Sequence, residues 1–218
     1  MPHNHTVIPR RLDDAGLEGS SVVANNAMNR ERQLAGVNSY ARELGFNPVD
    51  FLLDRPSARG WLDLCCGTGR ALNQARASLP AGVALVGVDL VDYFDPAAVG
   101  VELVCASVAS WSPGQAFDLV TCVHGLHYVG DKLGLLARAA SWLTDDGLLV
   151  ADLDLANLAL PLAALPVLRR AGFSYDARRR RVSLRGRRDV SWPYRYVGAD
   201  DRAGPNYTGQ PAVCSHYV

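Results

Sequence analysis

Short apolar runs alternate with longer amphipathic segments through the middle of the 218-residue chain. The runs are nearly continuous in apolar residues, which is typical of parallel strands that are buried on both faces. They lie at residues 60–65, 84–88, 101–105, 117–123 and 148–153. Between them, the segments 69–79 and 131–143 place apolar residues at helical spacing, and we expect helices there. This alternation predicts an α/β fold in which helices cover both faces of a mostly parallel sheet.

The N-terminal part of the chain follows a different pattern. Residues 1–19 are rich in Pro, His, Arg and Asp, and we expect a flexible lead. From about residue 20 to Leu44 there is no proline and apolar residues return at helical spacing, so we expect one long helix. Asn47-Pro48 should open a second, short helix, because proline is favoured at the first helical position. Residues 20–56 would together form a helical cap or lid.

Residues 57–218 form the predicted core, whose C-terminal end is rich in β-structure. Residues 157–171 look helical, although Pro161 and Pro166 interrupt them. After them we expect short strands at 181–185, 194–198 and 213–217.

Composition narrows the class of protein and of partner. The chain is 49% hydrophobic and 20% charged, with a formal net charge of zero, so no overall field attracts nucleic acid or an anionic membrane. The most apolar long stretch is broken by charged residues and prolines, so we expect no membrane span. Five cysteines without metal-ligand spacing, in a chain that begins without an apolar leader, favour a reducing, cytoplasmic location.

The segment WLDLCCGTGR, residues 61–70, joins a buried strand to a helix through a glycine loop. Such a loop can hold a nucleotide, but no Gly-Lys-Ser/Thr follows it, and Leu72 stands where a dinucleotide fingerprint has its last glycine. Asp63 would also repel a pyrophosphate at short range. S-adenosylmethionine is instead cationic at both its ammonium and its sulfonium. A carboxylate beside the loop therefore favours that ligand.

These residues resemble motif I of the class I S-adenosylmethionine-dependent methyltransferases. Asp63, Gly67 and Gly69 match the motif, whereas Cys65 replaces its first glycine, so we expect residue 65 to avoid a conformation open only to glycine. Three further segments resemble family motifs in the same order: LVGVDL at 85–90, VCASV at 104–108 and FDLVTCVHGLHYV at 117–129. The resemblance covers roughly residues 58–155.

The resemblance implies a Rossmann-like class I methyltransferase fold with a seven-stranded sheet, and S-adenosylmethionine as cofactor, without a metal. Asp89 would bind the ribose hydroxyls, and Ser107 would contact the adenine amine where the family often has aspartate. The cofactor contacts that we expect are Asp63, Cys65, Gly67, Gly69, Asp89, Leu90, Ser107, Val108 and Val123. The acceptor would be a small molecule, a metabolite or natural product, methylated on oxygen or nitrogen by a monomer or homodimer.

The acceptor should bind beyond the C-terminal ends of the fourth and fifth strands, where parallel sheets open a crevice. His127 and His124 follow the fourth strand, and either could act as a general base or merely pack. Asp154 follows the fifth strand and could act as a base or as a cap. Candidate acceptor-binding residues are Arg30, Tyr40, Tyr128 and Tyr207.

Two alternatives remain open at this point. Nine arginines between Arg169 and Arg188 are typical of a solvated hairpin but could also grip the phosphates of an RNA. We expect no nucleic acid partner, because the net charge is zero and few aromatic residues, Tyr175 among them, are interleaved with these arginines. The Asn/Asp-Pro-Pro-Tyr/Phe motif of base-methylating enzymes is also missing after the fourth strand. The second alternative, a non-catalytic binding protein, predicts a degraded glycine loop, but this loop is intact.

Overall fold

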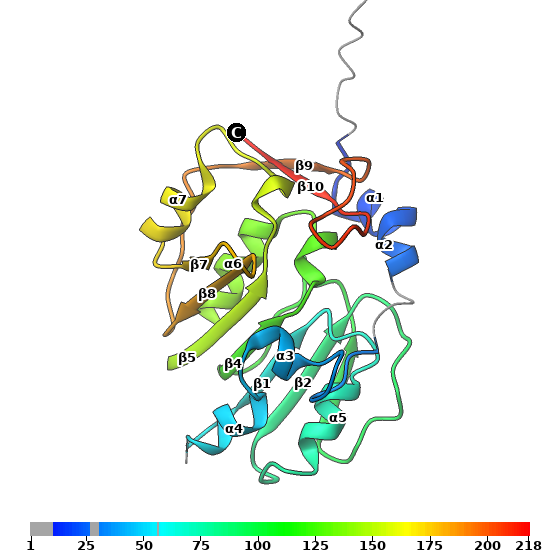
Figure 1. Cartoon of the computed structure of the whole chain (residues 1–218), viewed down its shortest axis with the longest axis vertical. Helices are drawn as coiled ribbons and strands as arrows, with labels where there is room; N and C mark the ends of the chain where they lie inside the picture. The colour runs from blue at the N-terminus through cyan, green and yellow to red at the C-terminus, as the bar shows by residue number, and fades with distance from the viewer. Residues whose placement is uncertain (1–10, 27–30, 56) are drawn as a thin grey trace, which may run out of the picture.

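The computed structural model of the protein describes residues 11–26, 31–55 and 57–218. Its centre is a seven-stranded sheet in the order β3-β2-β1-β4-β5-β8-β7 (Figure 1). The strands are β1 (Gly60–Leu64), β2 (Ala84–Asp89), β3 (Val101–Cys105), β4 (Phe117–Cys122), β5 (Leu143–Asp152), β7 (Ser174–Asp176) and β8 (Arg181–Arg185). The first five strands in this order are parallel, and β8 runs antiparallel to both β5 and β7. This confirms the predicted mostly parallel, seven-stranded sheet.

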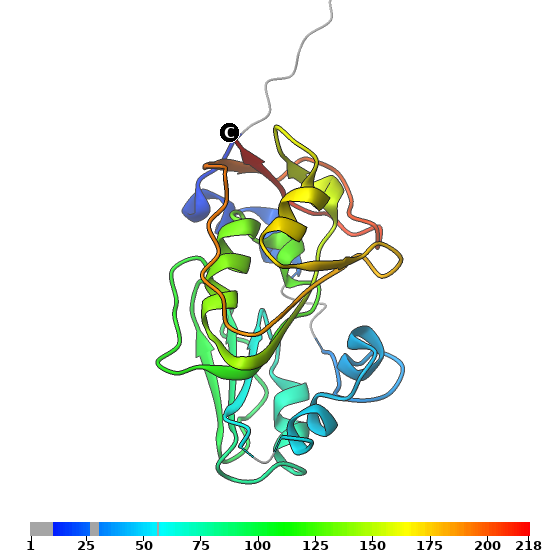
Figure 2. The ribbon, with the colours of Figure 1, turned by 90° about the vertical axis from the view of Figure 1, so that its left-hand side faces the viewer.

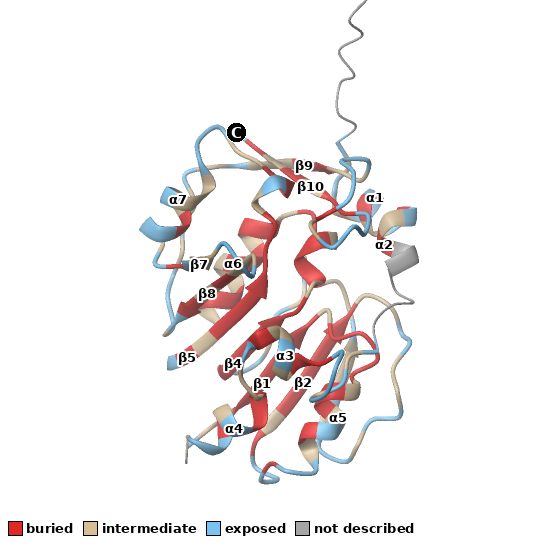
Figure 3. Ribbon diagram, in the orientation of Figure 1, coloured by how far each residue is buried: buried red, intermediate tan, exposed pale blue. Residues whose placement is uncertain are grey.

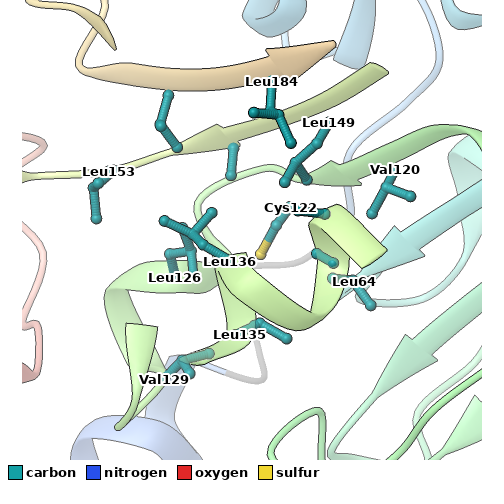
Figure 4. Close-up of a cluster of buried hydrophobic side chains, with 14 of the residues drawn as sticks. Leu64, Val120, Cys122, Leu126, Val129, Leu135, Leu136, Leu149, Leu153 and Leu184 are labelled. Atoms are coloured by element: carbon teal, nitrogen blue, oxygen red, sulfur yellow. The ribbon is translucent and has the colours of Figure 1, made fainter. Parts of the chain in front are cut away.

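Helices cover both faces of this sheet. Successive side chains of a strand point to opposite faces, and the apolar ones on each face need a layer of helices to bury them. On one face, Trp61 and Leu119 pack with α3 (Tyr40–Leu44), α4 (Pro48–Leu53) and α5 (Arg70–Arg76). On the other face, strand residues pack with α6 (Lys132–Ser141) and α7 (Ala164–Arg170). Figure 4 shows Leu135 and Leu136 of α6 beside side chains of β1, β4 and β5. The central strands are buried along almost their whole length, as a doubly covered sheet requires (Figure 3).

A second, three-stranded sheet forms the β-rich C-terminal end. Its order is β6-β10-β9, from β6 (Leu158–Ala159), β9 (Tyr196–Asp200) and β10 (Cys214–Tyr217). The N-terminal segment joins it, because Leu12 pairs with Ala199. In Figure 2 this sheet and α1 (Asp14–Glu18) lie at one end of the molecule, and α4 and α5 lie at the other. None of the described helices is long and apolar enough to cross a membrane.

Three predictions about the elements are wrong. The expected helix from residue 20 to Leu44 is two short helices, α2 (Ser21–Asn26) and α3, because Ser39 is extended and its side chain caps α3 by accepting from the Arg42 amide. The lead at 1–19 contains α1, whose Leu17 is only 1% exposed; residues 1–10 lie outside the described residues.

The third wrong prediction concerns residues 157–171, where the chain first forms a 3-10 turn, η3 (Leu155–Asn157), and the short strand β6. α7 starts only at Ala164, after Pro161, and keeps Pro166 in its first turn, where a missing N–H is tolerated. Elsewhere the predicted strands and helices lie within a few residues of the observed ones. That residues 20–56 act as a lid stays a prediction.

Candidate active site

A cavity of about 720 Å³ opens at the C-terminal ends of the parallel strands. Its wall comes from segments far apart in the sequence: the glycine loop after β1, the end of β2, the loop after β4, the segment around α3, α1, the β7–β8 turn and residues 207–210. This is the position at which open α/β sheets place their ligands.

The glycine loop is tied to the end of β2 by Asp89. The Asp89 carboxylate accepts hydrogen bonds from the backbone amides of Gly67, at 2.9 Å, and Val91, at 3.2 Å. Gly69 has a φ of 75°, and a Cβ at this position would lie 2.6 Å from a methyl group of Leu103. Glycine is therefore required there both by conformation and by space. Asp89 and Gly67 line the cavity, as do Leu90 and Val123, which were also expected to contact the cofactor.

The prediction for Cys65 is wrong. Cys65 adopts a left-handed conformation with a φ of 58°, although it is not glycine. Its Cβ lies against Gly125, where a further Cβ would come within 2.4 Å of it. Cys65 lines the cavity, so its predicted contact with the cofactor is compatible with its position.

Asp63 lies behind the loop rather than in the cavity wall. It is only 1% exposed and accepts hydrogen bonds from Tyr40, at 2.5 Å, and Thr121, at 2.6 Å. Burial raises the pKa of Asp63 to about 7, while these two hydrogen bonds act in the opposite direction. Tyr40, which Asp63 holds, does line the cavity. Asp63 is therefore placed to position Tyr40, and its contact with a cofactor stays a prediction.

The expected adenine contact involves a residue that the sequence did not reveal. The Ser107 hydroxyl donates to the Glu18 carboxylate of α1 and accepts from the Ala109 amide at 3.1 Å. Glu18 and Val108 line the cavity, whereas Ser107 lies outside its wall. The carboxylate that faces the cavity beside Ser107 thus comes from α1, and an adenine contact at this point stays a prediction. No sequence signal indicated Glu18, because the segment was interpreted as a flexible lead.

His124 lies between two carboxylates. Its Nε2 is 3.5 Å from Glu43 Oε2 and 3.9 Å from Asp152 Oδ2, and its backbone amide donates to Asp152 at 3.1 Å. The hydrogen bond with His124 lowers the pKa of Glu43, whereas burial raises the pKa of Asp152. Glu43, which no sequence motif indicated, also pairs with Arg32 at 3.1 Å. An imidazole held in this way can accept a proton and remain stabilised as the cation.

The same three side chains are a geometrically possible metal site. Ligand atoms of Glu43, His124 and Asp152 all lie within 4.8 Å of one another. However, Arg32 already pairs with Glu43. This guanidinium group would repel a divalent cation, so the trio fits proton handling better than metal binding. That no metal is needed stays a prediction.

His127 lies deeper in the same wall. It is 1% exposed, and neither ring nitrogen has a hydrogen-bond partner in the part of the chain that the structure describes. Burial, with contributions from His124 and Lys132, lowers the pKa of His127 to about 3, so its ring is neutral. The His127 ring centroid lies 5.4 Å from that of Tyr207 and 6.3 Å from that of Tyr128, both of which line the cavity as expected of acceptor-binding residues.

Asp154 does not line the cavity, which argues against the predicted catalytic role. Its carboxylate accepts hydrogen bonds from Arg180, at 2.9 Å, and from the backbone amides of Ala156, at 3.1 Å, and Tyr207, at 3.0 Å. Asp154 therefore holds the segment 201–213, the C-terminal strap, against the cavity. Of the other candidates, Arg30 lies outside the described residues.

Solved structures of similar fold include several methyltransferases. The plantazolicin methyltransferase BpumL, in complex with a substrate analogue and SAH, is 16% identical over 47% of this chain and 42% of that chain, with a TM-score of 0.42. CalS10, a SAM-bound amino pentose methyltransferase from Micromonospora echinaspora, is 26% identical over 48% of this chain and 47% of that chain, with a TM-score of 0.40.

The sugar N-methyltransferase KedS8 from Streptoalloteichus sp. ATCC 53650 is 30% identical over 47% of this chain and 44% of that chain, with a TM-score of 0.39. The match thus spans less than half the length of each of these three structures. No curated protein is significantly similar to the chain in sequence. A family model described as a methyltransferase domain matches residues 37–195, which include the sheet, the glycine loop and both histidines. The chain therefore belongs to the methyltransferase-domain family and has its class I fold.

Proposed function

We propose that the protein transfers a methyl group from S-adenosylmethionine to an oxygen or nitrogen atom of a small molecule, a metabolite or natural product. The observation that carries this proposal is the shared cavity: the Asp89-bound glycine loop and the carboxylate-held imidazole of His124 line one space. A donor site and a proton acceptor in one cavity are the two parts that this reaction requires.

The donor half fits a cationic nucleoside. Asp89 and Leu90 at the end of β2 would hold the ribose, and Val108 and Glu18 would face the base. Three carboxylates, those of Asp14, Glu18 and Asp89, line this part of the cavity and would favour a positively charged ligand. When bound, the cofactor supplies an electrophilic methyl group: the acceptor's lone pair forms the new bond while the carbon–sulfur electron pair returns to sulfur, leaving a neutral thioether.

His124 is the proposed general base. It takes the proton that the acceptor hydroxyl or amine must lose, and Glu43 and Asp152 stabilise the imidazolium that forms. General-base catalysis contributes roughly 10²–10⁴-fold to a rate, and alignment in the cavity supplies much of the rest.

The free thiols of all five cysteines support a reducing compartment such as the cytoplasm.

The test is calorimetric titration with S-adenosylmethionine and S-adenosylhomocysteine. We expect micromolar binding, about −8 kcal/mol, that Asp89→Asn weakens by at least about tenfold, since the exchange removes a charge-assisted bond. Asp92→Asn, at an exposed position three residues further along, is the matched control and should bind like the wild type. If neither compound binds the wild-type protein, the proposed function is wrong.

A further inference from the structure

Apart from the Arg32–Glu43 ion pair, the charged residues of the cavity wall are segregated by sign. Asp14, Glu18 and Asp89 belong to α1 and to the end of β2, whereas Arg178, Arg179 and Arg181 belong to the turn between β7 and β8 and the start of β8. In the sheet order, β1, β4 and β5 separate β2 from β8. Figure 1 shows α1 and the β7–β8 hairpin on opposite sides of the molecule. One end of the cavity is therefore acidic and the other basic.

The basic end is built by a defined turn. Asp176 Oδ1 accepts from the backbone amides of Arg178, at 2.9 Å, and Arg179, at 3.0 Å. Arg180 has a φ of 51° and turns its side chain toward Asp154 and the Tyr207 ring, so it ties the hairpin to the C-terminal strap. The three neighbouring arginines are left to line the cavity.

Positive charge is in excess at this end. Arg42, on α3, also lines the cavity, and the C-terminal carbonyl of α3 accepts from Arg181, which holds the helix beside the hairpin. Among the described residues, Arg42 and Arg178 form no ion pair, and Arg179 pairs with the exposed Asp176. Guanidinium groups without carboxylate partners are suited to bind carboxylate or phosphate.

Aromatic rings line the cavity wall beside His124, and one of them, that of Tyr207, also contacts Arg180 of the β7–β8 turn. The His124 ring centroid lies 5.7 Å from that of His127 and 6.3 Å from that of Tyr207. The unpartnered nitrogens of the buried His127 offer a hydrogen bond to a polar ligand at this point. A flat ring seated here would have His124 on one side and the arginines on another.

We propose that the methyl acceptor is an aromatic hydroxyl or amine compound that carries an anionic group, a carboxylate or a phosphate, which the arginines of the β7–β8 turn and Arg42 bind. The inference rests on the proposed function and names its acceptor class. The acidic end of the cavity would take the cationic donor and the basic end the anionic acceptor, so each ligand would be directed to its own end.

The nine arginines between Arg169 and Arg188 do not form one continuous face that an RNA could follow. In the strand register, Arg181 lies opposite Asp152 at the cavity end of β5, whereas Arg185 lies opposite Leu148 in the middle of that strand. Arg169 and Arg170 lie on α7. This distribution favours a small anion over a polyanion.

The experiment begins with protein saturated with S-adenosylhomocysteine, whose binding is measured first. Three probes are then titrated calorimetrically: 4-hydroxybenzoate, 4-hydroxyphenyl phosphate and the neutral 4-hydroxybenzamide. We expect at least one anionic probe to bind about tenfold or more tightly than the amide, since hydrogen bonds to a charged group are stronger than neutral ones. The double variant Arg42→Gln/Arg178→Gln should abolish this preference.

Arg185→Gln is the matched control, because this exposed arginine lies on the same hairpin but outside the cavity wall, and it should keep the preference. Thermal unfolding and S-adenosylhomocysteine affinity of the double variant verify that it is folded. Equal binding of neutral and anionic probes, no binding of either anion, or an unchanged preference in the double variant would overturn the inference. So would a single-stranded RNA oligonucleotide that binds more tightly than both anions. Failure of S-adenosylhomocysteine to bind would instead overturn the proposed function.

Discussion

His124 is fixed by its backbone as well as by its side chain. Its φ of 58° is left-handed, and its amide donates to the same carboxylate that lies near its ring. His124→Asn is therefore the informative substitution, because Asn tolerates this conformation but is not a base. We expect turnover to fall by about 10²–10⁴-fold while S-adenosylhomocysteine affinity stays unchanged.

Steady-state kinetics with the anionic phenols and calorimetry with S-adenosylhomocysteine measure the two quantities separately. Glu43→Gln should reduce turnover less than His124→Asn does, because it leaves the base in place and removes one of the two carboxylates near it. A His124→Asn protein with normal turnover would exclude His124 as the base.

His127 should weaken the fold in acid. Its pKa in the folded protein is about 3, against an ordinary value of 6.5, so the unfolded chain binds more protons between these values. Its contribution to stability is present above about pH 6.5 and is lost as the pH falls toward 3. His127→Phe removes this proton uptake, and the decline of the unfolding free energy between pH 6.5 and 4 should become shallower.

Urea unfolding at a series of pH values measures this decline. His216→Gln is the comparison, because His216 is only partly buried and should contribute less. An identical pH dependence in wild type and His127→Phe would show that His127 is not a buried neutral histidine.

At the scale of single residues, the sequence identified positions better than roles. Asp63, Asp89 and both histidines lie at or beside the cavity, because local motifs place them at strand ends. The role of Asp63 depends instead on Tyr40, which is 23 positions away and donates to it. Such a long-range partner leaves no local pattern.

Among the elements, α3 links the N-terminal segment to the sheet. Tyr40 donates to Asp63 and packs edge-on against Trp61, with ring centroids 5.5 Å apart. Tyr40→Phe keeps the ring and removes the donor to a buried carboxyl group. We expect the unfolding free energy to fall by about 1–3 kcal/mol, measured by urea unfolding at pH 8. Tyr93→Phe, at an exposed position, is the control; equal stability of both variants would contradict the proposed tie.

The C-terminal strap depends on the chain's single lysine. Lys132 is fully buried, and its Nζ donates to the carbonyls of Val129, at 2.9 Å, and Val213, at 2.7 Å, and to the Ser215 hydroxyl, at 3.0 Å. Lys132→Met keeps an unbranched apolar chain but leaves these acceptors without their donor. We expect a loss of about 1–3 kcal/mol in unfolding free energy and faster amide exchange in β10.

Hydrogen exchange read by mass spectrometry locates the effect. Peptides from β10 and the strap should exchange faster in Lys132→Met, while those from β1 and β4 should not change. Uniformly faster exchange over the whole chain would mean that Lys132 stabilises the protein in general rather than the strap.

The sequence predicted the buried strands better than the N-terminal helices, for a physical reason. β1, β2 and β4 were found because strands buried on both faces are continuous apolar runs. The helix expected from residue 20 to Leu44 was wrong: within that segment, the apolar side chain of Val37 is 83% exposed instead of packed. Helical spacing over a short segment does not by itself determine where a helix begins. The Ser39 cap and the packing of α3 against the sheet determine it here.

At the scale of the whole molecule, the cavity could not be predicted from any one segment. Its wall combines α1, α3, three strand ends, the β7–β8 turn and the C-terminal strap. The sequence predicted the main sheet, whose parallel strands follow one another along the chain. It did not predict that α1 would line the cavity, and of the strap it indicated only Tyr207. Leu12 meets Ala199, and Tyr207 meets Asp154, only in the folded protein.

A cavity assembled from both ends of the chain makes ligand binding and global stability interdependent. A ligand that binds only the folded state stabilises it by about 2.7 kcal/mol at one hundred times its Kd. For a chain of this size, this corresponds to a rise in Tm of about 5–10 °C. We expect S-adenosylhomocysteine to produce this shift in the wild type and in Asp92→Asn, and a much smaller one in Asp89→Asn. Differential scanning fluorimetry measures it, and an equal shift in Asp89→Asn would place the nucleoside elsewhere in the molecule.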